Sequence, residues 1–177
     1  DEASNGRGYA HWAVSGAAGF PGGGPTARFV TRPEARTQSK WFDTGEIDGC
    51  QRFQLFGLEN VVNLGSLSIV AEYMGVNAER SDAEDVYFHG GYVYAAYFLT
   101  GEHQPWERYS GTLGRVKPLE NFFRVRRCDG GCGGGLGAWQ IAVRYSHGDF
   151  SDDDILGGVG DSVTAGLNWW WNPYARM

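Results

Sequence analysis

The stretch that decides the fold is Ser162-Val-Thr-Ala-Gly-Leu-Asn-Trp-Trp-Trp171, which ends at Asn172-Pro173. In an extended chain, successive side chains point to opposite faces. One face of this stretch is therefore apolar and carries Val163, Ala165, Leu167, Trp169 and Trp171, while the other carries Ser162, Thr164, Gly166, Asn168 and Trp170. An apolar face that ends in tryptophans at a turn is typical of a strand that crosses a membrane, because aromatic side chains gather at membrane interfaces.

The same alternation recurs in two earlier segments, Ser66-Leu-Ser-Ile-Val-Ala-Glu-Tyr73 and Ala138-Trp-Gln-Ile-Ala-Val-Arg-Tyr145. In both, the apolar side chains share one face, so Glu72 and Arg144 point to the other. In a soluble sandwich that second face meets solvent, and in a large barrel it meets a water-filled lumen. The pattern therefore predicts antiparallel strands but leaves both architectures open.

The composition favours one all-β domain with many turns, because 177 residues include 28 Gly, only 6 Pro and 15% aromatic residues. No run approaches the roughly 18 apolar residues of a spanning helix, so any membrane crossing must use strands. The formal net charge of −6 argues against a nucleic-acid partner, which requires a basic face.

Alternating runs bounded by turn residues predict seven full strands and an eighth that begins at Tyr174. The expected strands are Gly8 to Ala18, Ala27 to Glu34, Gln51 to Leu64, Ser66 to Val76, Val86 to Leu99, Gly137 to Ser146 and Ser162 to Trp171. Each full run is close to the roughly 9–11 residues that cross a bilayer at a tilt.

If consecutive strands run in opposite directions, their connections fall alternately at the two ends of the sheet. Short turns at Gly19 to Pro25, Leu64-Gly65 and Asn172-Pro173 share one end, and longer loops at Ala35 to Gly49, Asn77 to Asp85 and His147 to Gly160 share the other. Outer-membrane barrels show this asymmetry. The exception is Thr100 to Leu136, which is long yet falls at the short-turn end, so we expect it to fold into the lumen.

This exceptional connection is rich in cations, with Arg108, Arg115, Lys117, Arg124, Arg126 and Arg127. Inside a pore they would favour anions, because low-dielectric walls focus their field. Alternation places Arg115 and Lys117 on one face with Val116 opposite. The spacing alone favours an exposed basic loop instead.

Other clusters point to no catalysis, cofactor or metal. Cys128 and Cys132 could close a small disulfide loop or stay free thiols, and two thiolates alone make a poor zinc site. The acidic cluster Asp149, Asp152, Asp153 and Asp154 lacks the spacing of a calcium-binding loop and is better explained as a solvated loop. No nucleophile elbow or zinc-protease helix motif occurs, so we expect no enzyme.

Several motifs together resemble the C-terminal half of the phosphate-selective porins. The most specific are Tyr97-Phe-Leu-Thr-Gly-Glu-His-Gln-Pro-Trp106 and Gly111-Thr-Leu-Gly-Arg-Val-Lys-Pro118, followed by Gly137-Ala-Trp-Gln-Ile-Ala-Val-Arg-Tyr-Ser146 and Leu167-Asn-Trp-Trp-Trp-Asn-Pro173. Upstream, Thr31-Arg-Pro-Glu34, Phe42-Asp-Thr-Gly45, Gly57-Leu-Glu59 and Glu72-Tyr-Met74 follow in the family's order.

The resemblance implies an antiparallel transmembrane β-barrel of sixteen strands in a bacterial outer membrane. This chain would supply about seven to eight of them, with residues 1–177 as the C-terminal part of one barrel domain. It also implies a homotrimer that passes anions such as phosphate or polyphosphate without a cofactor. In that family, arginines line the lumen, and an inward loop of the N-terminal half, absent here, carries much of the central anion site. Arg115 and Lys117 match the Gly-Arg-Val-Lys-Pro motif and Arg144 matches the lumen side of its strand. We add Arg124 as a candidate for the anion pathway because it lies on the same long connection.

One alternative from a different class is a secreted β-sandwich that binds carbohydrate, in which Trp169 to Trp171 would stack on sugars. A further expectation concerns the last strand, which Met177 cuts short. We expect an incomplete barrel, that is, a curved open sheet with two free edges, because a closed eight-stranded barrel would leave no pore.

Overall fold

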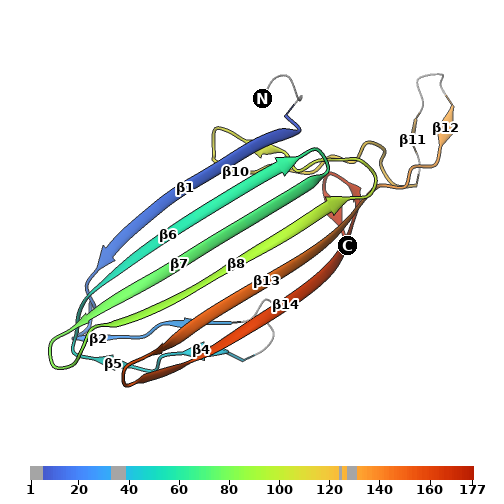
Figure 1. Ribbon diagram of the computed structural model, residues 1–177. Helices are drawn as coiled ribbons and strands as arrows, with labels where there is room; N and C mark the ends of the chain where they lie inside the picture. Colours follow the sequence, from blue (N-terminus) through green and yellow to red (C-terminus); the bar gives the residue numbers. More distant parts are fainter. Residues whose placement is uncertain (1–5, 33–38, 124, 127–130) are drawn as a thin grey trace.

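The computed structural model describes residues 6–32, 39–123, 125–126 and 131–177, and its regular structure consists of strands (Figure 1). Six strands are long: β1 (Gly8–Gly19), β6 (Cys50–Leu64), β7 (Leu67–Arg80), β8 (Val86–Phe98), β13 (Ala138–Asp152) and β14 (Ile155–Asn172). The short β15 (Ala175–Arg176) follows. Within the described ranges, no helix is long and apolar enough to cross a membrane.

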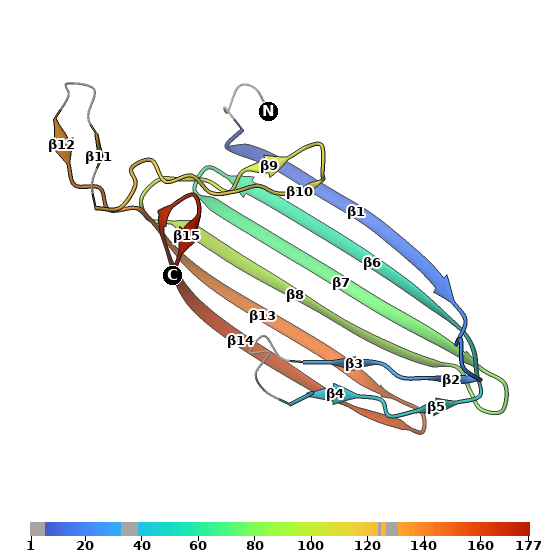
Figure 2. The same ribbon diagram turned by 180° about the vertical axis from the view of Figure 1, so that it is seen from behind.

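These strands form one antiparallel sheet in the order β1-β6-β7-β8-β13-β14-β15. The sheet curls like half of a cylinder (Figures 1 and 2). In the strand order, β1 and β15 lie at opposite edges and do not meet. The expected curved, open sheet is therefore confirmed.

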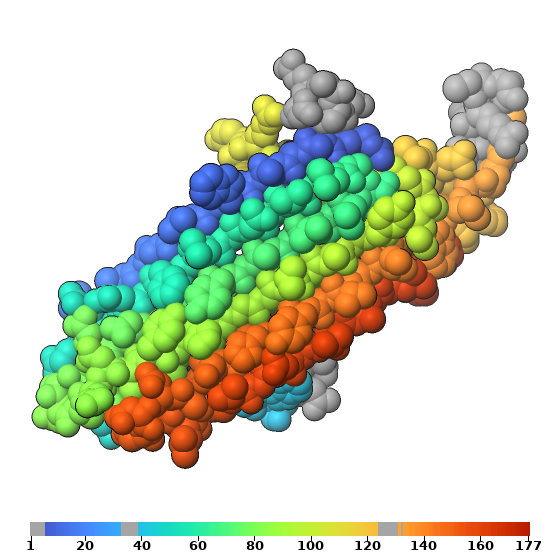
Figure 3. Space-filling view, in the orientation of Figure 1, coloured from blue at the N-terminus to red at the C-terminus, as the bar shows by residue number. Residues whose placement is uncertain are grey.

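The outer, convex face of the sheet is apolar, as the alternation predicts. Ile141, Val143 and Leu167 are 48%, 55% and 58% exposed, so no second sheet covers them within the described part of the chain. The six long strands together make this face one continuous surface (Figure 3). A sandwich would bury these side chains against a second sheet, and the carbohydrate-binding sandwich is therefore wrong.

Aromatic side chains lie near both ends of the outer face. Trp139 stacks on Trp169 at one end, with ring centroids 4.7 Å apart. At the other end, Phe56 stacks on Tyr87 and Tyr87 stacks on His89. Amphipathic rings of this kind suit the two interfaces of a bilayer.

We call the two ends of the sheet the turn end and the loop end. The turn end holds the Gly65 turn, the Asn172–Tyr174 turn and the long 99–137 segment, as expected. The loop end holds one excursion of residues 20–49 and the turns at residues 81–85 and 153–154.

Two expectations about the loop end are wrong. Ala27 to Glu34 does not form a strand of the wall. Its described part contains only the short β2 (Thr26–Ala27) and β3 (Val30–Thr31), which pair with β5 (Ile47–Asp48) and β4 (Phe42–Asp43). The turn expected at Gly19 to Pro25 therefore belongs to the 20–49 loop at the opposite end of the sheet. The reason is tertiary: the buried side chain of Ile47 and the half-buried Phe29 pack with Val86 and Phe88 of the sheet.

The second correction concerns the last hairpin. The loop expected at His147 to Gly160 is instead ordered strand, because β13 and β14 continue past a bulge near Asp149 to a tight turn at Asp153-Asp154. Asp153 adopts a positive φ of 48°, which aspartate tolerates better than most residues. The polar residues of this hairpin interrupt the apolar alternation, so the pattern predicted a loop, but the hydrogen-bonded pairing of β13 with β14 continues through them.

Candidate functional site

The inner face of the sheet carries a line of charged and hydroxyl-bearing side chains at mid-height. The register places Glu59 opposite Glu72, Glu72 opposite Tyr92, and Tyr92 opposite Ser146. Directly paired residues share a face, so these side chains all point into the curve of the sheet. His11 lies 3.0 Å from a carboxylate oxygen of Glu59.

Arg144 lies two residues from Ser146 along β13, nearer the turn end, and is paired with Tyr94. Its guanidinium carbon is 3.8 Å from the centre of the Tyr92 ring, and its Nε donates a hydrogen bond to the Ser146 hydroxyl over 2.8 Å. The predicted inward direction of Arg144 and Glu72 is therefore confirmed. The flat ring contact holds the guanidinium in place without neutralising its charge.

The first half of the 99–137 segment, with β9 (Trp106–Glu107) and β10 (Thr112–Leu113), lies over the inner face at the turn end, whereas β11 (Val125–Arg126) and β12 (Cys132–Gly133) project away from the sheet (Figure 2). Val116 is buried with Phe98, Ala138 and Trp170, all on the inner side. Val116 is thus buried between two exposed cations, Arg115 and Lys117, and the shared face expected for these two cations stays a prediction. Arg124 and Cys128 lie outside the described residues, so the roles expected for them stay predictions.

A buried carboxylate fixes this segment. Glu102 is 2% exposed, accepts a hydrogen bond from the Thr100 hydroxyl, and accepts another from the Leu119 amide over 3.0 Å. The Thr100 hydroxyl also accepts a hydrogen bond from the Trp139 amide. The Thr100-Gly-Glu102 motif therefore ties the chain just after Val116 to the sheet.

A cavity lies beneath this segment, and we call it the turn-end cavity. Two cations, Arg115 and Arg176, line it, together with the amides of Gln104, Gln140 and Asn168. Arg115 also lies over the Tyr174 ring, with its guanidinium carbon 4.6 Å from the ring centre. Arg144 is four residues along β13 from Gln140, which is about 13 Å at the usual rise per residue.

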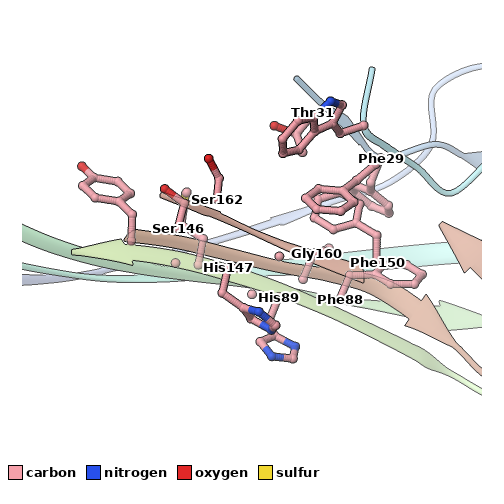
Figure 4. Close-up of a pocket in the computed structure, with 18 of the residues that line it drawn as sticks. Phe29, Thr31, Phe88, His89, Ser146, His147, Phe150, Gly160 and Ser162 are labelled. Carbon is pink, nitrogen blue, oxygen red and sulfur yellow. The ribbon is translucent and has the colours of Figure 1, made fainter. Parts of the chain in front are cut away.

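A second cavity, the loop-end cavity, lies between the 20–49 loop and the sheet, and its volume is about 370 Å³. Figure 4 shows Ser146 and Ser162 on the same side of the sheet as Phe29 and Phe150, whereas His89 and His147 lie on the other side. Arg144 lines this cavity from the turn end. The sequence pattern predicted a loop at Ala35 to Gly49 at this end but not its packing against the sheet, because the contacts are with residues far along the chain.

The loop owes its shape to a short turn, Phe42-Asp-Thr-Gly45. Asp43 accepts a hydrogen bond from the Gly45 amide over 3.1 Å, and Gly45 has a positive φ of 70°. Arg28 donates two hydrogen bonds to the same carboxylate. The hydrogen bond from Arg28 lowers the pKa of Asp43 to about 2, so this ion pair persists at neutral pH.

The acidic cluster of the last hairpin has a structural role. The side chain of Arg80 is 3% exposed and contacts Asp153 at 3.0 Å and Asp154 at 2.7 Å, while Asp152 accepts a hydrogen bond from the Tyr87 amide. The cluster therefore joins two neighbouring turns at the loop end. Among the described residues, no group of three or more acidic, histidine or cysteine side chains could hold a metal ion.

The structure brings the candidate residues together only in part. Arg115 and Arg144 line the two cavities of one inner face, Lys117 is exposed on the segment that covers it, and Arg176 joins Arg115 although the sequence pattern did not indicate it. The arrangement offers guanidinium and amide donors to a solute that moves along the sheet.

Comparison with known families identifies the chain. The family model described as phosphate-selective porin O and P matches residues 14–177, which is essentially the whole chain. The chain is also 32% identical over 114 residues to an uncharacterized protein of Caulobacter vibrioides, an alignment that covers 64% of this chain and 21% of that protein. The aligned part thus spans about a fifth of the relative's length. The chain belongs to the phosphate-selective porin family, which is a family of channels and implies an outer membrane.

Proposed function

We propose that this porin chain forms part of the wall of an outer-membrane channel that passes anions, including phosphate. The observation that carries the proposal is that Arg115, Arg144 and Arg176 line the two inner cavities while the outer face is apolar. Arginine suits this role because it stays charged and offers a planar fork to phosphate oxygens. Polyphosphate, with repeated charges, would use the same series of guanidinium groups.

Three further parts of the proposal concern the assembly. Residues 1–177 act as the C-terminal part of one barrel domain, further strands pair with the edges at β1 and at β14–β15, and the full barrels associate as homotrimers. The support is physical: an unpaired strand edge in a bilayer leaves backbone amides without hydrogen bonds, at a cost of several kcal/mol each. The trimer rests on family membership alone.

The inner face also carries acidic groups, which oppose the arginines. Glu59 and Glu72 face each other across β6 and β7. His11 contacts Glu59, and the chain's formal net charge is −6. Anion preference therefore depends on the positions of the cations and not on the net charge of the chain. The experiment must replace single charged side chains one at a time.

The test is the reversal potential of the full-length protein in planar bilayers under a salt gradient. Lys117→Glu and Arg144→Gln should each lower the anion-to-cation permeability ratio. A unit charge about 5 Å away in water favours an anion by roughly 0.8 kcal/mol and disfavours a cation by the same amount, so the ratio falls by at most about sixteenfold per charge removed. The wild-type ratio should also fall as salt screens the lumen.

Arg108→Gln is the matched control. Arg108 is exposed in the turn between β9 (Trp106–Glu107) and β10 (Thr112–Leu113) and lines neither cavity, so its replacement removes one charge, as Arg144→Gln does, but away from both cavities. Equal effects of Arg108→Gln and Arg144→Gln would show that only the overall charge matters. A cation-selective wild-type channel would refute the proposed anion selectivity.

A further inference from the structure

The loop-end cavity has an apolar wall that a path for inorganic phosphate does not need. Trp41 on the loop is 51% exposed, and Leu55 and Met74 on the inner face of the sheet are 42% and 50% exposed, and all three line the cavity. Apolar surface left in a water-filled lumen is unfavourable, and its burial against an apolar part of a solute is favourable. Hydrated inorganic phosphate gains nothing from such a wall.

The apolar wall includes flat rings. Phe42 lies over the backbone of Gly148 and Gly160, where a Cβ atom would come within 2.7 Å and 3.4 Å of its ring. Phe42 also stacks on Phe150, with ring centroids 5.4 Å apart and planes 23° apart. With the indole of Trp41 beside it in the chain, this region offers aromatic surfaces suited to a further ring.

The other end of the same cavity is polar. Arg144, Ser146 and Ser162 line it, and Figure 4 shows both serine hydroxyls on the side of the sheet that carries Phe29 and Phe150. Gly148, beneath Phe42, is four residues from Arg144 on β13, so their backbones are about 13 Å apart. The Arg144 side chain reaches towards Gly148, because its Nε donates a hydrogen bond to the Ser146 hydroxyl over 2.8 Å. The cavity therefore has a charged end and a flat apolar end.

We propose that this cavity selects organic anions that carry an aromatic ring, such as aryl phosphates. The charged group contacts Arg144 and the two hydroxyls, and the ring lies against Phe42 and Trp41. The inference rests on the proposed anion channel and names the class of solute that this part of the channel favours. The contacts are few and open to water, which permits release as well as binding.

The experiment uses the full-length protein in planar bilayers, with phenyl phosphate and methyl phosphate as probes of equal charge. Each is added at increasing concentration, and the concentration that halves the chloride current is measured. Phenyl phosphate should block at a concentration roughly two- to tenfold lower than methyl phosphate, which is the range expected of one aromatic contact.

Trp41→Ala should remove most of this difference and leave the methyl phosphate value unchanged. Met74→Gln is a second variant. It makes the apolar wall more polar at a residue of the sheet and leaves the loop residues unchanged. Tyr109→Ala is the control, because Tyr109 is fully exposed in the turn between β9 and β10 and lines neither cavity. Arg144→Gln should raise the blocking concentrations of phenyl phosphate and methyl phosphate by the same factor.

Equal blocking by the two phosphates in an anion-selective channel would overturn this inference and leave the proposed function standing. A Trp41→Ala channel that still prefers phenyl phosphate, together with a Met74→Gln channel that does so, would also overturn it. That result would show that the aromatic ring binds elsewhere in the channel. A cation-selective reversal potential, measured on the same channels, would instead refute the anion channel itself.

Discussion

Replacing Val143 with arginine tests whether the convex face meets lipid. Val143 is 55% exposed on that face, and the two residues directly paired with it, Ala165 and Ala95, are apolar. On β13 it lies four residues from both Trp139 and His147. Each interval is about 13 Å along the strand, or about 10 Å along the membrane normal at a tilt of about 40°. Val143 is therefore near the middle of the apolar band.

A guanidinium at that depth should cost about 2–4 kcal/mol on the depth-dependent scale of barrel proteins. This free energy corresponds to a folding equilibrium roughly 30- to 700-fold less favourable. The assay is reversible denaturant unfolding of the full-length protein in lipid bilayers, followed by tryptophan fluorescence. The fitted free energy of unfolding of Val143→Arg is compared with that of the wild type.

Ala142→Arg is the matched control, one residue away on the opposite face. Ala142 lines the turn-end cavity, and its neighbour Gly166 has open space where a side chain would begin, so an arginine there can reach water. It should cost far less than Val143→Arg. If the two variants lose the same free energy of unfolding, or if Val143→Arg loses less than about 0.5 kcal/mol, Val143 does not face lipid.

Two further predictions concern the 20–49 loop. Gly148→Val should displace the Phe42 ring, because a Cβ atom at Gly148 would lie 2.7 Å from it, whereas a Cβ atom in the control Gly166→Val meets nothing within 4 Å. Limited proteolysis of the loop should therefore increase for Gly148→Val only. Equal cleavage of the two variants would contradict the packing of Phe42 on Gly148. The Arg28 hydrogen bond lowers the pKa of Asp43 to about 2, so the stability from this pair is present above about pH 4 and is lost as the pH falls towards 2. Tryptophan fluorescence should report that acid transition, and it should be absent from Asp43→Asn.

Local patterns predicted the wall of the channel well. Alternation with a period of two acts between neighbours in the chain, so Trp169, Leu167 and Val143 could be assigned to the outer face and Arg144 to the inner face before any fold was known. The same reasoning predicted that Val116 lies opposite Arg115 and Lys117. These features depend only on which side of a strand a residue occupies.

The position of the 20–49 loop could not be predicted in this way. Its described residues have the composition of a strand followed by a loop. They fold inward because Phe29 contacts Phe88, and Phe42 contacts Gly148 and Phe150, across separations of 59 to 108 positions along the chain.

The sequence by itself thus determined most of the wall strands of this protein, their two faces and the inward direction of Arg144. The tertiary structure alone decided the two cavities and the residues that share them. The physical reason is range: the side-chain alternation of a strand is set by its own backbone, whereas a cavity exists only where distant segments pack against one face of the sheet.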